Sequence, residues 1–354
     1  MSHSIMIHQI TLIDEEGLEK TLVEEGYTQD QIQYTTDFIK DLFDQAAVRI
    51  FHDMLAKPLP DSIKIRLLRD KEPVVDVWRQ SFEMAGFVTK DHDPRHLVFY
   101  VREFVFRSII DKEDNGYFIV TALHEMLHAA DMSVIQSGNA FLDEADNGLQ
   151  NYRLAYGSND INPFYAVFDI VSLLLKYRYE GVAVMGSLLL TKRKIEHFST
   201  DPQSFRAQVR SLFWSVTLLL MGEGRDEGVI ERLHETAYHE APGVLLRVML
   251  NNGDLSDACY EKAMIGLEKE EHELTEEELS MMIKRALDMD VKTFLRGLFT
   301  LAKDGQTIAP KEPILEFLKL WKENYRGTNE VSLFTNEDSL LGELRDVVKS
   351  FFAH

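Results

Sequence analysis

Two histidines and a glutamate, close together in the sequence, are the residues best suited to carry chemistry in this chain. His124, Glu125 and His128 form the pattern H-E-x-x-H. Residues four apart on an α-helix project from one face, one turn above each other, so both imidazoles could bind one metal ion from the same side. Glu125 is one step round the helix, where it could act on a water bound to that metal. This arrangement is typical of zinc hydrolases, which combine two nitrogen ligands, an open coordination position and a carboxylate base.

The sequence around the motif predicts a buried helix. No proline occurs between Asn115 and Met132, no glycine follows Gly116, and Asn115 is suited to cap the N-terminus of the helix. A broad apolar face follows, made of Phe118, Ile119, Ala122, Leu123, Met126, Leu127 and Ala130. Short patterns also arise by chance, so the alternative is a metal-free helix with two partly exposed histidines and a solvated glutamate.

Composition restricts the function classes. The chain has 354 residues and a formal net charge of −21, which argues against non-specific binding to nucleic acid and against anionic membrane surfaces. The single cysteine, Cys259, excludes an intrachain disulfide and indicates a reducing compartment. The N-terminus has no signal-peptide pattern, and no apolar run is long enough to cross a bilayer. We therefore expect a cytoplasmic protein, while its oligomeric state is left open.

Three short β-like segments precede the motif helix. Ile63–Leu68 alternates apolar and polar residues, and Phe87–Thr89 and His96–Val101 are rich in β-branched and aromatic residues. Almost all other periodic segments are helical. We predict a mostly helical α+β protein in which a small sheet packs on the motif helix, with helical N- and C-terminal regions at residues 1–60 and 251–354 on either side of a core at residues 61–250.

Further helices are expected along the chain. Thr28, with Gln31 as its capping-box partner, begins one near the N-terminus. The others are expected at residues 74–84, 164–190, 204–221 and 227–250, the last interrupted near Pro242, and again after Pro310. The acidic run at residues 268–278 is typical of a solvated helix face or a linker.

The order of these elements resembles the gluzincin, or thermolysin-like, class of zinc metallopeptidases. The similarity covers about residues 60–250, and its motifs are the H-E-x-x-H helix and the later sequence Glu180-Gly181-Val182-Ala183. In that class the third zinc ligand is a glutamate on a downstream helix, frequently written E-G-aliphatic-A in compact members. The resemblance implies a zincin-like core, Zn²⁺ held by His124, His128 and Glu180, and a peptide or protein substrate.

The resemblance also implies further roles, with departures from the class pattern. The strand before the motif helix, His96–Val101, would be the edge strand to which an extended peptide adds. A later helix would supply a donor to the oxyanion, for which Tyr238 and His239 are candidates and His234 a third; packing or surface roles are the alternative for each. The class often has an aspartate four residues after the glutamate ligand, but Val184 stands here. Asp131 is a candidate to orient a histidine instead, or else an ordinary polar residue at the helix end.

The third ligand can also be argued from the residues themselves. Four acidic residues downstream of the motif are close enough in sequence: Asp131, Glu144, Asp146 and Glu180. Asp131 has a short side chain about 4.5 Å further along the same helix than His128, and the next two acidic residues lie in a polar stretch. Glu180 is flanked by apolar residues, so it would be buried, and a metal would compensate for the cost of burying its charge. A salt bridge with Lys176 or Arg178 is the alternative.

The predicted residues imply a hydrolytic mechanism, and three other kinds of protein are alternatives. Glu125 would take a proton from a zinc-activated water and deliver it to the leaving amine. A catalytically inactive zincin-like protein that binds a partner is the main alternative. An all-helical phosphohydrolase would need a His-Asp pair, but the pairs at residues 52–53 and 92–93 lie outside the motif helix. A helical scaffold without metal is the last possibility, and zinc analysis separates it from the others.

Overall fold

The structure is a computed structural model that describes residues 9–14, 17–69, 86–88, 95–111, 116–131, 162–196, 198, 200–201, 203, 227–291, 293–294, 297–298 and 301. The chain divides into two compact units. Unit 1 comprises Met1–Gln136, Gly186–Thr191 and Leu279–Lys284, and unit 2 comprises the remaining residues. The predictions of helices at residues 74–84 and 204–221 and after Pro310 fall outside the described residues.

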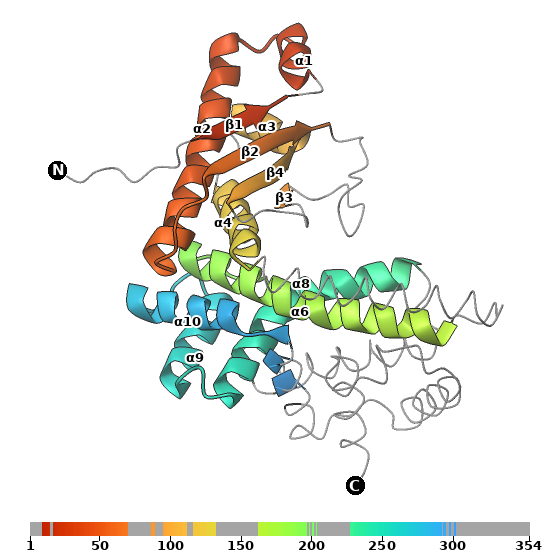
Figure 1. Cartoon of the computed structure of the whole chain (residues 1–354), viewed down its shortest axis with the longest axis vertical. Helices are drawn as coiled ribbons and strands as arrows, with labels where there is room; N and C mark the ends of the chain where they lie inside the picture. Colours follow the sequence, from red (N-terminus) through yellow and green to blue (C-terminus); the bar gives the residue numbers. More distant parts are fainter. Residues whose placement is uncertain are drawn as a thin grey trace. The chain divides into compact units, whose positions relative to one another are not determined.

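Unit 1 contains a four-stranded sheet in the order β1-β2-β4-β3 (Figure 1). Its strands are β1 (Ile10–Ile13), β2 (Ser62–Leu68), β3 (Gly86–Val88) and β4 (His96–Arg102). β1, β2 and β4 are parallel, and β3 runs antiparallel to β4. The three predicted strands are confirmed. β1 was not predicted, since residues 1–60 are expected to be mostly helical. A run of four apolar or β-branched residues is too short to show a period, so the sequence pattern does not reveal this strand.

The expectation that His96–Val101 is an edge strand is wrong. β4 pairs along its whole length with β2 and, from Phe99 to Val101, with β3 on its other side. Among the described strands, β3 is the edge next to β4. A segment of three residues carries almost no periodic signal, so its pairing with β4 could not be predicted from the sequence.

The helices that lie wholly within unit 1 are α1 (Leu18–Glu24), α2 (Gln29–Ala47), the π-helix η1 (Val48–Met54), α3 (Glu103–Ile110) and α4 (Gly116–Ala130). The predicted capping box is confirmed, since Thr28 Oγ1 accepts from the backbone N–H of Gln31 and the Gln31 side chain accepts from that of Thr28. α4 contacts α2, η1 and β3. Most of its predicted apolar face is buried, with Met126 and Leu127 fully so, whereas Ile119 is exposed and Ala130 is half-buried.

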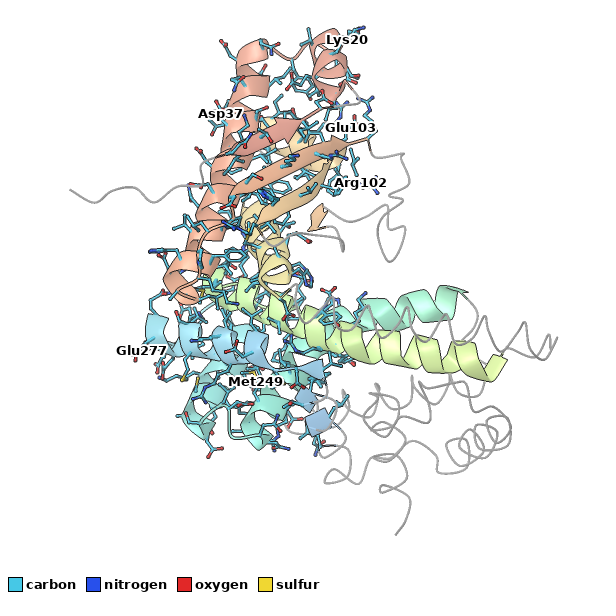
Figure 2. All side chains as sticks on the ribbon, in the orientation of Figure 1. Lys20, Asp37, Arg102, Glu103, Met249 and Glu277 are labelled. Atoms are coloured by element: carbon cyan, nitrogen blue, oxygen red, sulfur yellow. The ribbon has the colours of Figure 1, made fainter. Side chains whose placement is uncertain are left out.

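A charged network fixes the junction between β4 and α3. Figure 2 labels Arg102 and Glu103, the last residue of β4 and the first of α3. Arg102 is only 1% exposed, and its Nη1 donates to the backbone oxygen of Arg69 at 3.1 Å. Glu103 accepts from Arg107 at 2.6 Å and pairs with Arg69 at 3.2 Å. These bonds hold the carboxyl end of the sheet, from which the chain leads to α4.

The helices that follow along the chain are α6 (Asn162–Thr191), α8 (Glu227–Asn251), α9 (Asp257–Glu268) and α10 (Glu276–Asp288). α6 belongs to unit 2 as far as Met185 and to unit 1 from Gly186. The predicted interruption near Pro242 is wrong, because α8 continues through this proline. The residues that follow, Val244–Leu246, Val248 and Met249, are fully buried, and their packing offsets the loss of one helical hydrogen bond.

The acidic run at residues 268–278 is a connection that leads into a helix. α9 ends at Glu268, and Thr275 begins α10 with a second capping box, in which Glu278 is the partner. Of the helices in the described part of the chain, none is long and apolar enough to cross a membrane.

Candidate metal centre

Helix α4 brings the two motif histidines together. The Nε2 atoms of His124 and His128 lie 3.1 Å apart, and the two rings are nearly perpendicular, at 85°. Two nitrogens bound to one tetrahedral zinc at about 2.0–2.1 Å lie roughly 3.3 Å from each other. The observed separation therefore suits a shared ion. A hydrogen bond between the rings has a similar length, so the choice between the two depends on a third group.

Glu180 on α6 is that third group. A carboxylate oxygen of Glu180 and one nitrogen from each histidine all lie within 4.8 Å of one another. Within the described ranges, these three residues form the one grouping of histidine, cysteine or acidic side chains that could hold a metal ion. His124 is buried, while His128 and Glu180 are half-buried. Two nitrogens and one carboxylate oxygen are a donor set that fits zinc.

A close helix contact explains how α6 approaches α4 in unit 1. Gly186 of α6 faces Leu127 of α4, and a Cβ atom added at Gly186 would lie 2.6 Å from Leu127 Cδ1. Leu127 precedes His128 directly, and Glu180 lies six residues before Gly186 on the same helix. A larger residue at this position would require the Leu127 side chain to shift, so Gly186 lets the two helices approach closely next to His128 in sequence.

Glu125 and Asp131 are close in sequence to the two histidines but are not members of the three-residue grouping. Glu125 is 5% exposed and lies on α4 directly after His124. Glu125 is not a member of the three-residue grouping. This agrees with the role of a base that acts on the water without binding the metal. Asp131 follows α4 and is 2% exposed. Burying a carboxylate requires compensating bonds, which favours the role of orienting a neighbouring group over that of a solvated residue.

Of the predicted oxyanion donors, His239 alone has a described side chain, and it is not a member of the three-residue grouping. His239 is exposed on α8. The side chains of Tyr238 and His234 lie outside the described residues, as do Glu144 and Asp146. The Arg178 guanidinium, predicted as a possible salt-bridge partner of Glu180, donates to the backbone oxygen of Met289 at 2.8 and 3.0 Å, and more distantly to that of Leu287.

One pair near the cluster has no counterpart in the sequence-based predictions. The Tyr177 hydroxyl donates to Glu240 Oε2 at 2.7 Å. Tyr177 lies on α6 one turn before Glu180, and this spacing could have indicated that it lies near the proposed ligand. Glu240 lies on α8, 63 residues away in sequence from Tyr177, and no local pattern predicts that pairing.

Comparison with known proteins gives no further guide to function. The chain matches no protein family, no curated protein and no solved structure. The candidate centre therefore rests on the positions of His124, His128 and Glu180.

Replacing Gly181 by valine should destabilise the packing of α6 on α8. A Cβ atom at Gly181 would lie 3.0 Å from the backbone oxygen of Ala241 and 3.1 Å from Leu245 Cβ, neither of which can move cheaply. We expect Gly181→Val to lower the free energy of unfolding by about 2 kcal/mol or more, as overpacking does. The exposed helical residue Ala258 provides the control, since Ala258→Val should cost at most about 0.7 kcal/mol of helix propensity. Urea denaturation measures both, and equal effects would show that the contact is not tight.

Proposed function

We propose that this protein is a zinc metallopeptidase of the gluzincin type, with a zincin-like core, which hydrolyses peptide bonds. The observation that supports this most strongly is the grouping of His124, His128 and Glu180 from two helices. Three protein ligands leave one coordination position open for water, as in catalytic rather than structural zinc sites. The buried Glu125 directly after His124 supplies the carboxylate that such a site needs.

In the proposed mechanism each residue has a separate task. His124 and His128 would hold the metal through their imidazole nitrogens, and Glu180 through one carboxylate oxygen. Bound zinc would supply Lewis acidity, which polarises a carbonyl and lowers the pKa of a coordinated water. Glu125 accepts the proton of the attacking water and delivers it to the nitrogen of the leaving amine. Its burial limits competition from bulk water for that proton.

Strand β3 is the proposed docking edge for the substrate, in place of β4. β3 pairs with β4 on one side and is the last strand of the described sheet on the other. It also contacts α4, the helix that carries the histidines. An extended peptide could add to this edge through backbone hydrogen bonds, which would bring its carbonyls alongside α4.

A zincin-like binding protein without catalysis is the second candidate. It is favoured by the exposed position of His239, the one predicted oxyanion donor whose side chain is described. Loss of one oxyanion donor typically costs about 3 kcal/mol of transition-state stabilisation. Such a protein would hold zinc and bind peptides without cutting them.

A peptide-cleavage assay distinguishes the two candidates. The zinc-loaded protein is incubated with a mixed peptide library, and new termini are identified by mass spectrometry. We expect cleavage that a zinc chelator stops and added zinc restores, because the attacking water depends on the metal. Intact peptides in the presence of fully zinc-loaded protein would favour the binding protein instead.

A further inference from the structure

The bond between Tyr177 and Glu240 lies one turn from Glu180 and has no part in the mechanism above. Tyr177 is 2% exposed, and its hydroxyl donates to Glu240 Oε2 at 2.7 Å, an ordinary length for an O–H···O hydrogen bond. Burial, together with the charge of Glu240, holds the pKa of Tyr177 well above its usual value. The phenol therefore remains protonated, and a donor, at neutral pH.

The α6 segment that carries Glu180 is fixed on two sides within unit 2. Tyr177 and Gly181 are four residues apart and share a face. That face meets α8, through Glu240 for Tyr177 and through the backbone oxygen of Ala241 for Gly181. On the next side, the fully buried Arg178 donates to the backbone oxygen of Met289, just after α10.

Helix α8 lacks one backbone hydrogen bond where it meets this segment. Pro242 lies inside α8 and has no backbone N–H, so it cannot donate to the carbonyl oxygen four residues earlier. Glu240 stands two residues before Pro242, within the affected turn. A side-chain bond to Glu240 is therefore well placed to fix α8 against α6 where the helix has lost a hydrogen bond of its own.

The rotation of α6 about its axis determines where the Glu180 carboxylate lies. Three residues correspond to about 300° on an α-helix, so Glu180 projects roughly 60° round the axis from Tyr177. A carboxylate about 6 Å from the axis moves by about 1 Å when the helix turns by about 10°. Functional sites tolerate displacements of only about 0.5 Å. A bond that prevents this rotation would therefore affect metal binding without touching the metal.

We propose that Tyr177 is a positioning residue of the metal centre, whose hydrogen bond to Glu240 fixes the rotation of α6 and so the position of the Glu180 carboxylate. The proposal rests on metal binding by Glu180, and adds a support that the H-E-x-x-H pattern does not contain.

Tyr177→Phe removes the hydroxyl and keeps the ring. We expect its affinity for Zn²⁺, measured by competition with a chelating indicator, to fall about tenfold, like the smallest losses caused by removing a direct partner of a metal ligand, because Tyr177 acts on Glu180 only through the helix. The visible absorption of the Co²⁺-loaded protein should change as well, because it reports the coordination geometry. Tyr27→Phe is the matched control: it also removes a tyrosine–carboxylate bond, to Asp111 at 3.0 Å in unit 1, and should leave both readouts unchanged.

Two variants of Glu240 separate geometry from charge. Glu240→Gln keeps an oxygen that can accept from Tyr177, so we expect its zinc affinity to stay within about threefold of the wild type. Glu240→Ala should match Tyr177→Phe, and urea denaturation of the metal-free proteins establishes that each variant is folded. Wild-type affinity in both Tyr177→Phe and Glu240→Ala would overturn the proposal, and so would a Glu240→Gln variant as weak as Glu240→Ala. A wild-type chain that binds no zinc would refute the proposed metal centre itself.

Discussion

Replacing Glu125 by glutamine is expected to abolish peptide hydrolysis while zinc remains bound. The amide has nearly the shape of the carboxylate but cannot accept the proton of the attacking water. General base catalysis contributes about 10²–10⁴-fold to the rate, so we expect a loss of at least that size. Metal content and cleavage rate, measured on the same preparation, test both halves of this expectation.

The control for this variant is Glu277→Gln, which makes the same chemical change on the exposed surface of α10 (Figure 2). It should retain full activity and full zinc. Loss of zinc from Glu125→Gln would make Glu125 a ligand and overturn its assignment as the base. Undiminished hydrolysis would show that another group accepts the proton.

Replacing Glu180 by alanine is expected to lower the affinity for zinc by more than about 100-fold. Loss of a group that only hydrogen-bonds to a metal ligand typically costs about 10–100-fold, and loss of a ligand itself should cost more. The variant leaves only the two histidines of α4, whose Nε2 atoms are 3.1 Å apart, to hold the ion. Two ligands from one helix approach from one side and leave the rest of the coordination sphere to water. Competition with a chelating indicator measures the change.

Two further alanine variants calibrate the loss at Glu180. Asp131→Ala should weaken zinc binding only modestly, as expected for a buried carboxylate outside the ligand grouping. Glu144→Ala, in the polar stretch of the sequence, should leave the affinity unchanged. Full zinc occupancy in Glu180→Ala would remove the gluzincin assignment, because the third ligand would then come from elsewhere.

Features with a strong local pattern could be predicted from the sequence. The helix around His124 and His128 and the long helix α6 have enough apolar residues at helical spacing to be recognised. β2 and β4 are seven residues each, long enough to show β-strand character. The candidate third ligand was predicted from family resemblance as well as from its apolar surroundings, and Glu180 does lie beside the two histidines.

Features that depend on distant pairing could not be predicted. The interior position of β4 depends on β3, a strand of only three residues. The bonds from Tyr177 to Glu240 and from Arg178 to Met289 join residues 63 and 111 positions apart. Pro242 is a strong local signal for an interruption, yet tertiary packing keeps α8 continuous. In each case an interaction remote in sequence determines the local outcome.

The central claim is that His124, His128 and Glu180 bind one zinc ion together. X-ray absorption at the zinc edge, on protein loaded with one equivalent of Zn²⁺, tests it most directly because it reports the number and type of ligands. We predict a tightly bound ion with two imidazole nitrogens at about 2.0–2.1 Å and further oxygen ligands, and the loss of one imidazole in His128→Ala. A zinc shell without imidazole, or one unchanged in His128→Ala, would contradict the metal centre proposed for this protein.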